Sequence, residues 1–215
     1  MPAAVSEAER QLLLQLAAGP VSGDALAARE GLTRAAVWKR IEALRHAGVA
    51  VSAVPGRGYR LAQPLDLLEA QAIQAALPDE VHPVALEVAW TLDSTNAELL
   101  RRPAPEHGCT VLLAERQTGG RGRRGRQWVS PLAAHVYLSV SRRFEGGLSR
   151  LGGLSLVAGV AACEALHGLG LTQVRLKWPN DLVVMAGGMC KLGGLLVEGG
   201  GEVAGSSRAV IGLGV

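Results

Sequence analysis

Residues 118–128 read Thr118-Gly119-Gly120-Arg121-Gly122-Arg123-Arg124-Gly125-Arg126-Gln127-Trp128 and lie between two strand-like segments, residues 109–115 and 135–141. The four glycines allow several backbone N–H groups to turn toward one anion, and the four arginines supply guanidinium groups that match carboxylates and phosphates. The pattern lacks the Gly-Lys-Ser/Thr of a Walker A loop and the helix that follows a dinucleotide fingerprint. We expect an anion-binding loop, mobile when empty and ordered by its ligand. A disordered Arg/Gly segment that binds RNA is the alternative, against which the flanking strands and Trp128 weigh.

Around this loop the chain alternates strand-like and helix-like segments. Helices are expected at residues 94–102 and 148–169, with a connecting helix at 65–77. Most connections are too short for a doubly wound parallel sheet, so we expect a mixed, largely antiparallel sheet with its helices on one side. The fold class is therefore α+β. Strands are expected at residues 84–90, 109–115, 135–141, 174–177, 182–185, 191–198 and 209–213.

The first 63 residues have the pattern of a winged helix-turn-helix. Ser22 is expected to cap a second helix, and Thr33 a third whose apolar stripe is Val37, Ile41 and Leu44. Two short strands around a Pro-Gly-Arg-Gly turn at residues 55–58 follow. Helix, turn, helix and a basic hairpin occur in this order in DNA-binding modules.

The third helix is predicted to enter a DNA groove. Small side chains on its outward face permit close approach, while its basic and aromatic side chains can reach phosphates or bases. A protein-interaction domain with a solvated basic face is the alternative interpretation. The residues predicted to contact or position DNA are Ser22, Thr33, Arg34, Ala35, Ala36, Trp38, Lys39 and Arg57.

The composition of the 215 residues excludes several classes of protein. Hydrophobic residues make up 48% of the chain, enough for a sizeable core, which excludes disorder of the bulk of the chain. The three cysteines form no C-x-x-C pair, which argues against a disulfide framework or a cysteine-based zinc site. No signal peptide is recognised, and the longest apolar stretch, residues 151–171, is too polar to span a bilayer. We expect a cytoplasmic protein with no membrane contact and no metal ligands of its own.

The net charge of +3 is unevenly distributed. Residues 116–126 carry five arginines and no acidic residue, whereas residues 64–115 carry nine acidic and two basic residues. The first 63 residues carry eight basic and five acidic residues. These two basic regions indicate two separate anionic partners, although a solvated face explains the weaker, N-terminal one equally well. Only three of the 22 basic residues are lysines, Lys39, Lys177 and Lys191. Genomic base composition explains such a bias, and the alternative interpretation is that these are positions where an arginine would not serve.

Two further segments complete a candidate site. Ser94-Thr95-Asn96 begins a predicted helix and can hydrogen-bond a small polar ligand, although a helix cap alone explains Ser94. Lys177-Trp178-Pro179-Asn180-Asp181 follows a strand, and Lys191 opens another whose glycines let a ligand lie close. No nucleophile or metalloprotease motif accompanies them. A cationic site of this kind fits a reaction whose nucleophile belongs to the substrate, such as activation of a carboxylate by ATP.

Taken together, these motifs resemble the family of bifunctional biotin protein ligases that also act as biotin operon repressors. The resemblance covers essentially the whole chain, and the Gly/Arg loop with the Lys-Trp-Pro-Asn-Asp segment is its most specific part. It implies a winged helix-turn-helix domain at residues 1–63, a connection at 64–82 and a catalytic domain like that of class II synthetases at 83–215. The shared motifs continue through Lys191-Leu192-Gly193-Gly194-Leu195-Leu196-Val197-Glu198 to Ile211-Gly212-Leu213-Gly214.

The resemblance also implies an activity. Biotin and Mg-ATP would give biotinyl-5′-AMP, and the biotinyl group would pass to a lysine of a biotin carboxyl carrier protein. Adenylate that is not consumed would promote a homodimer that binds operator DNA. A repressor that senses the adenylate without ligase turnover and a lipoate-type acyl ligase are the alternative functions.

Individual residues take roles by the same resemblance. Arg123 and Lys191 are the expected catalytic residues. The substrate-binding set that the resemblance implies for biotin and its adenylate is Ser94, Thr95, Asn96, Gln117, Gly120, Arg121, Gly122, Arg123 and Lys191, with Trp128, Asn180 and Asp181 on the nucleotide side.

The chain departs from the family pattern at its C-terminal end. Family members continue past the Gly-x-Gly strand into more of the catalytic domain and a small β-barrel domain, and an Asn usually follows that strand. The chain ends at Val215. We therefore expect the C-terminal part of the family architecture to be absent, either because the sequence is a fragment or because part of the ATP site is lacking.

Overall fold

The computed structural model describes residues 7–201 and 205–215. They form two compact units, one made of the chain up to Leu67 together with Ser130–Ala134 and the other of Leu68–Val129 with His135–Val215. None of the described helices has the length and apolarity that a bilayer crossing requires. We describe each unit by itself.

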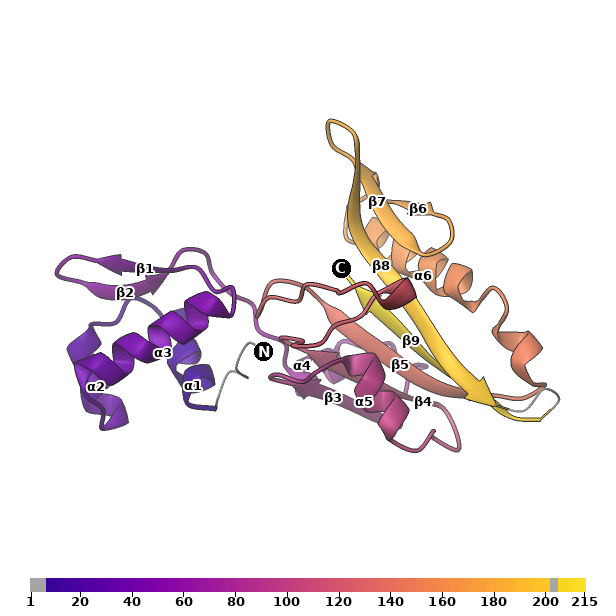
Figure 1. Cartoon of the computed structure of the whole chain (residues 1–215), viewed down its shortest axis with the longest axis horizontal. Helices are drawn as coiled ribbons and strands as arrows, with labels where there is room; N and C mark the ends of the chain where they lie inside the picture. The colour runs from indigo at the N-terminus through magenta and orange to yellow at the C-terminus, as the bar shows by residue number, and fades with distance from the viewer. Residues whose placement is uncertain (1–6, 202–204) are drawn as a thin grey trace. The chain divides into compact units, whose positions relative to one another are not determined.

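The N-terminal unit begins with three helices, α1 (Glu7–Ala17), α2 (Gly23–Glu30) and α3 (Arg34–His46) (Figure 1). The expected caps are confirmed: Ser22 Oγ accepts from Ala25 N at 3.1 Å and Thr33 Oγ1 accepts from Ala36 N at 3.2 Å. The apolar stripe of α3 is buried as predicted, as are the leucines of α1 and α2, the two helices that α3 contacts. These buried residues are Val37, Ile41, Leu44, Leu12, Leu13, Leu16 and Leu26.

The hairpin of strands β1 (Val51–Val54) and β2 (Gly58–Leu61) forms the wing. Val21 and Tyr59 exchange two backbone hydrogen bonds of 2.9 and 2.8 Å, which join the hairpin to the segment before α2. A Cβ at Gly58 would lie 2.2 Å from Val21 O, and the φ of Gly58 is +89°, so glycine is required there. Helix, turn, helix and wing therefore follow in the predicted order.

A distant segment completes this unit. Ser130–Ala134 comes just after the Arg/Gly loop in the sequence, yet it packs with the first 67 residues. Leu132 is buried, and its N–H donates to Ala47 O at 2.8 Å. Pro131 lies against Gly48, where an added Cβ would meet the proline Cβ at 2.6 Å. The N-terminal unit is thus assembled from two separate stretches of chain.

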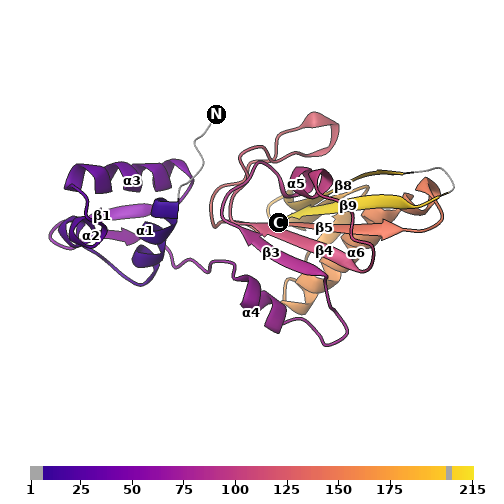
Figure 2. The same ribbon diagram turned by 90° about the horizontal axis from the view of Figure 1, so that it is seen from below.

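The second unit contains a seven-stranded sheet of order β3-β4-β5-β9-β8-β7-β6 (Figures 1 and 2). Strands β3 and β4 are parallel and every other neighbouring pair is antiparallel, so the expected mixed, largely antiparallel sheet and the α+β class are confirmed. The elements are α4 (Ala70–Ala75), β3 (Ala85–Ala89), α5 (Thr95–Arg101), β4 (Cys109–Ala114), the 3-10 turn η1 (Arg123–Gly125), β5 (Tyr137–Phe144), the 3-10 turn η2 (Leu148–Leu151), α6 (Leu154–Gly168), β6 (Arg175–Lys177), β7 (Asp181–Met185), β8 (Met189–Gly201) and β9 (Ser207–Gly214).

The prediction that the helices lie on one side of the sheet is wrong. Val210 of β9 packs with Leu99 of α5, whereas Leu213 of the same strand packs against the cluster that contains Cys163 of α6. Residues three positions apart on a strand point to opposite faces, so α5 and α6 cover opposite faces of the sheet (Figure 2). Each face therefore has its own core beneath one helix.

Two predicted helices differ from the observed ones. Of the connecting helix expected at residues 65–77, only α4 forms. The helix expected at 148–169 is divided into η2 and α6 by Gly152 and Gly153. Gly153 has a φ of +80°, a left-handed conformation that interrupts a helix and that glycine adopts without strain.

Candidate binding pocket and DNA-binding face

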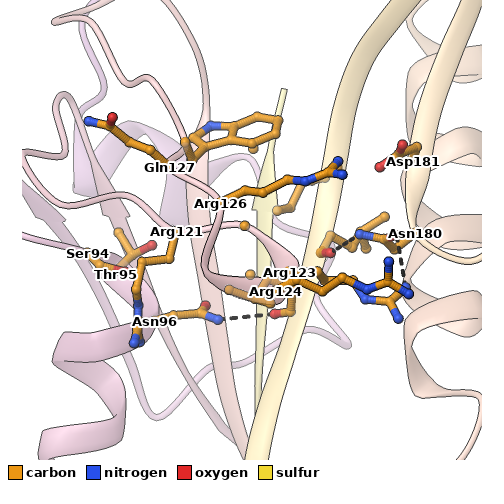
Figure 3. Close-up of a pocket in the computed structure, with 18 of the residues that line it drawn as sticks. Ser94, Thr95, Asn96, Arg121, Arg123, Arg124, Arg126, Gln127, Asn180 and Asp181 are labelled. Carbon is orange, nitrogen blue, oxygen red and sulfur yellow. Dashed lines mark hydrogen bonds between the residues drawn. The ribbon is translucent and has the colours of Figure 1, made fainter.

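A cavity of about 450 Å³ opens beside the start of α5, the first half of β8 and the last residues of β9 (Figure 3). This volume lies within the usual range of small-molecule sites. The pocket brings together all but one of the predicted substrate and nucleotide residues: Ser94, Thr95, Asn96, Gln117, Arg121, Gly122, Arg123, Trp128, Asn180, Asp181 and Lys191. The exception, Gly120, is buried outside the lining, where its carbonyl accepts from Trp128 N at 2.8 Å.

One end of the pocket, the neutral end, is made of buried, uncharged polar groups at the start of α5. Thr95 and Asn96 are 4% and 3% exposed. Gln117 Oε1 accepts from Thr95 N at 2.8 Å, and the buried Ser139 Oγ lies 2.7 Å from Thr95 Oγ1 and donates to Asn96 Oδ1 at 2.6 Å. Because these groups hold one another in a network, their positions are set before any ligand arrives.

The opposite end, the cationic end, is formed by half-exposed charged groups on β7 and β8 and in the loop. Lys191 Nζ lies 2.7 Å from Asp181 Oδ1 and 5.2 Å from the centre of the Trp128 ring. Arg123 Nη1 donates to Asn180 Oδ1 at 3.1 Å, and Asn180 Nδ2 donates in turn to Leu195 O at 2.8 Å. Neutral donors and acceptors therefore face cations across one cavity.

Glycines of the central strands let these groups approach the sheet. A Cβ at Gly212 would lie 2.4 Å from Asn96 Oδ1, and one at Gly214 would lie 2.7 Å from the Trp128 ring. At Gly194 the nearest atom would be Lys191 Nζ, at 3.1 Å. The Gly-x-Gly of β9 thus forms the floor beneath Asn96 and Trp128. Glycines repeated within a strand can indicate such a close approach of other groups to the sheet.

The Arg/Gly loop has a hairpin-like backbone. Gly122 N donates to Arg126 O at 2.7 Å, and Thr118 N and Gly119 N donate to Leu92 O and Asp93 O. The 3-10 turn at its tip places Arg124 at a φ of 58°. The loop joins the pocket through three further lining residues that the predicted set omitted, Arg124, Arg126 and Gln127.

The start of α5 is stabilised by an ion pair behind the pocket. Both carboxylate oxygens of Asp93 accept from Arg101, at 2.7 and 2.8 Å. Hydrogen bonding from Arg101, with backbone N–H groups of Ser94 and Asp93, lowers the pKa of Asp93 from 3.8 to about 2, against the opposing effect of partial burial. The negative charge of Asp93 at the helix N-terminus also stabilises α5 through a favourable interaction with the helix dipole.

Sequence reasoning missed two polar residues of this region. Ser139 of β5 is fully buried beneath Thr95 and Asn96, and Glu198 of β8 accepts from Asn96 Nδ2 at 2.9 Å. A serine that alternates with the apolar residues Leu138 and Val140 at the start of β5 was the available signal for the first. Within the described residues, no group of three or more His, Cys, Asp or Glu is placed to hold a metal ion.

Of the predicted DNA-binding residues, five lie on α3 and Thr33 caps it, whereas Ser22 caps α2 and Arg57 lies in the wing. The outward-facing residues of α3 are exposed, with Trp38 at 53%, and Arg34 pairs with Asp24 at 3.1 Å. Arg57 is exposed at the tip of the wing, whereas Ala36 is partly buried. The hydroxyls of Ser22 and Thr33 are used as helix caps, so their first role is to fix the start of α2 and α3.

The second unit matches a known family. A model described as the biotin/lipoate A/B protein ligase family matches residues 88–215, more than half of the chain. The chain belongs to this ligase family. A second model, described as an HTH domain, matches residues 9–60. The family resemblance inferred from the motifs is therefore confirmed.

Curated members of the ligase family are similar over most of the chain. Proteins named bifunctional ligase/repressor BirA from Salmonella typhimurium and Escherichia coli are 44% and 43% identical over 194 residues. These matches cover 90% of this chain and 58% of each relative, so the chain spans somewhat more than half the length of these relatives. The protein of the same name from Bacillus subtilis is 34% identical over 198 residues, which are 91% of this chain and 59% of that protein.

A solved structure shares the fold of the second unit. The biotin protein ligase from Leishmania major in complex with biotinyl-5-AMP has a TM-score of 0.51 and 28% identity, covering 62% of this chain and 57% of that one. The ligase-family fold of the sheet unit is thus supported by sequence and by structure.

Proposed function

We propose that the chain catalyses formation of biotinyl-5′-AMP from biotin and ATP and transfer of the biotinyl group to a lysine of a biotin carboxyl carrier protein. We further propose that its winged helix binds operator DNA and makes the protein a biotin-responsive repressor. Family membership and the names of its relatives support both halves. The observation that carries the ligase half is the polarity of the pocket, with buried neutral groups at one end and cations at the other.

This polarity suits biotin, whose fused-ring head is polar but uncharged and whose side chain ends in a carboxylate. In the proposed complex the head contacts Ser94, Thr95, Asn96 and Gln117. The carboxylate then lies at the cationic end beside Lys191, and Arg121, Gly122 and Arg123 cover the chain and the phosphate, with the Gly120 backbone supporting the turn. The cavity volume of about 450 Å³ is adequate for such a ligand.

The chemistry requires no protein nucleophile. A carboxylate oxygen of biotin attacks the α-phosphorus of ATP, and the bond to the bridging oxygen breaks to release pyrophosphate. The carrier lysine amine then attacks the acyl carbon and AMP leaves. Lys191 and Arg123 would act by holding two anions together and by balancing the charge that develops on the phosphorus oxygens. The compact ammonium of Lys191 already lies between Asp181 and the Trp128 ring, where it could reach both anions.

The nucleotide side would be formed by Trp128, Asn180 and Asp181. Mg²⁺ would enter with the ATP phosphates, which supply most of its oxygen ligands in sites of this kind. The described lining of the cavity contains one carboxylate, Asp181, which pairs with Lys191, so the protein would contribute at most one ligand to the ion.

The repressor half is supported by the exposed basic face of α3 and by the wing. In this proposal Arg34, Trp38 and Lys39 enter the major groove, Ala35 and Ala36 permit close approach, Arg57 reaches the DNA backbone, and Ser22 and Thr33 fix the helix starts. Two copies, brought together by the bound adenylate, would engage a two-part operator. A cytoplasmic location follows from these partners.

The test of the ligase proposal is pyrophosphate release by the full chain. Biotin with ATP should release pyrophosphate, lipoate with ATP should not, and Lys191→Ala should lower the rate at least about 100-fold, in the range seen when a charge-stabilising group is removed. Lys177→Ala is the matched control, because Lys177 is an exposed lysine on β6 outside the pocket lining. Release with lipoate would favour the lipoate-type ligase, which the family description also covers. Biotin and ATP binding without release would favour an adenylate-sensing repressor.

The DNA-binding proposal is tested separately. Arg34→Ala and Lys39→Ala should each weaken operator binding and reduce its dependence on salt by about one counterion, because each removes one phosphate contact, while ligation is unchanged. Arg10→Ala is the control, since Arg10 lies on α1 and pairs with Glu7 at 3.2 Å. Equal DNA affinity in all three variants would show that α3 does not enter the groove.

A further inference from the structure

Glu198 occupies a position behind the neutral end of the pocket. It lies on β8, opposite Val210 of β9, and its side chain is on the face of the sheet that α5 covers. It is 27% exposed and lies outside the pocket lining, and although it ends one of the shared motifs it has been given no role above. Its two carboxylate oxygens nevertheless contact two residues that do line the pocket.

The first contact fixes the amide of Asn96. Asn96 Nδ2 donates to Glu198 Oε2 at 2.9 Å and to Leu196 O at 3.1 Å, while Asn96 Oδ1 accepts from Ser139. A carbonyl and a carboxylate can only accept, so they require the amide nitrogen on the Glu198 side. Glu198 thereby determines that Asn96 presents its oxygen, and not its nitrogen, toward the neighbouring polar groups.

The second contact holds the first arginine of the loop. Arg121 Nη2 lies 3.2 Å from Glu198 Oε1 and 3.5 Å from Oε2. Among the ion pairs of the described residues, this is the one that joins the Arg/Gly loop to a carboxylate. Figure 3 shows the consequence: Arg121 turns down toward Asn96, whereas Arg123, Arg124 and Arg126 extend toward the side of Asn180 and Asp181. Glu198 therefore separates one guanidinium from three others of the same charge.

We propose that Glu198 is a positioning residue that anchors Arg121 and Asn96 together, so that the loop is attached to the neutral end of the pocket before the ligand binds. The identity of that ligand as biotin rests on the proposed function. In the ligand-free chain Arg121 is held by Glu198, so Lys191 and Arg123 at the other end meet the ligand carboxylate first, before Arg121 and Gly122 cover it. Without the Glu198 charge, Arg121 is a free cation near the end that should receive the uncharged head, and the loop loses an attachment.

Glu198→Gln tests this proposal with little change in shape. We expect the KM for biotin in pyrophosphate release to rise three- to tenfold with kcat changed less than twofold, because the charge acts on ligand placement and not on the reacting atoms. Arg121→Ala should also raise the KM, and the double variant should lose less than the two single losses combined, because both changes remove the Arg121–Glu198 ion pair while only Glu198→Gln weakens the Asn96 contact. Glu198→Asp, which keeps the charge, should recover part of the affinity.

A second readout does not require turnover. Trypsin cleaves after arginine, so cleavage within residues 121–126 of the ligand-free chain reports how firmly the loop is held. Glu198→Gln should increase this cleavage rate about fivefold while the thermal midpoint stays within about 2 °C. Glu87→Gln is the matched control, because Glu87 pairs with Arg102 at 2.9 Å on the surface of the same unit; it should change neither quantity.

The outcomes separate the two proposals. If the parent chain releases no pyrophosphate with biotin and ATP, the proposed function fails, and the cleavage experiment still tests the anchor. If Glu198→Gln leaves both the cleavage rate and the KM at their parent values, the positioning role is overturned. The same holds if the variant lowers kcat alone. A raised KM with a raised cleavage rate, absent from Glu87→Gln, supports it.

Discussion

The two ends of the pocket differ in how their side chains are held. The neutral end consists of Thr95, Asn96 and Ser139, which are almost completely buried and hydrogen-bonded to one another. The cationic end consists of Lys191 and Arg123 on exposed side chains, each with a partner that an anion could replace. Buried networks resist change, whereas half-exposed ion pairs contribute little and are readily exchanged. The neutral end is therefore suited to recognition of one shape, and the cationic end to ligands that change during a reaction.

Alanine substitution of the floor glycines should reveal this difference most strongly. Gly212→Ala places a Cβ 2.4 Å from the buried amide of Asn96, which has no space to move, whereas Gly194→Ala meets the flexible end of Lys191 at 3.1 Å. Overpacking a rigid site costs about 1–3 kcal/mol, so biotin affinity measured by calorimetry should fall up to about 100-fold in Gly212→Ala. In Gly194→Ala it should change less than about threefold because a side-chain terminus can shift. Equal losses in the two variants would contradict the contrast between the ends.

Removal of one hydroxyl from the neutral end should have an intermediate effect. Ser139→Ala leaves the buried Asn96 Oδ1 without its hydrogen-bond donor, whereas Thr95 Oγ1 keeps Gln117 Oε1 at 3.2 Å. The change should lower the free energy of unfolding by about 1–2 kcal/mol and biotin affinity about fivefold. Ser149→Ala, at an exposed serine of η2, is the control and should be neutral. Denaturant unfolding and calorimetry measure the two effects. An unaltered biotin affinity in Ser139→Ala would mean that the network does not position the ligand-binding groups.

The smallest expected effect is on the pH dependence of stability at the start of α5. The pKa of Asp93 is about 2 in the folded chain, against an ordinary 3.8, so the ion pair with Arg101 contributes fully above pH 4 and is lost as the pH falls through 2. Because the carboxylate is about half exposed, solvent screening limits this contribution to about 0.5 kcal/mol. Between pH 5 and pH 2 the stability advantage of the parent over Asp93→Asn should disappear in denaturant unfolding. A difference that stays constant with pH would assign the stabilisation to another group.

The features that could be predicted from sequence are local ones. Ser22 and Thr33 were recognisable as caps because a cap depends on residues within three positions of it. The pocket residues were recognisable because their motifs are contiguous, and the structure brings 11 of the predicted residues into one cavity. The roles of those residues toward a ligand remain predictions, which the variants above test.

The features that sequence reasoning missed depend on the register of distant strands. Glu198 meets Asn96, 102 positions away, only because β8 and β9 pair with this register beneath α5. The placement of α5 and α6 on opposite faces likewise depends on which of the alternating side chains of β9 point toward α5 and which toward α6. The periodicity of a single segment does not specify these contacts, because each contact depends on how at least two strands pair.

The packing of Leu132 into the N-terminal unit limits how this chain can be divided into fragments. The apolar surface beside Ala47 and Gly48 is covered by a segment that the sequence places more than 60 positions after the wing. A fragment ending at residue 67 would expose that surface to water and would lose part of its core. The N-terminal unit therefore cannot be transplanted onto another protein by itself: residues 130–134 would have to be carried along or replaced with an equivalent apolar cover.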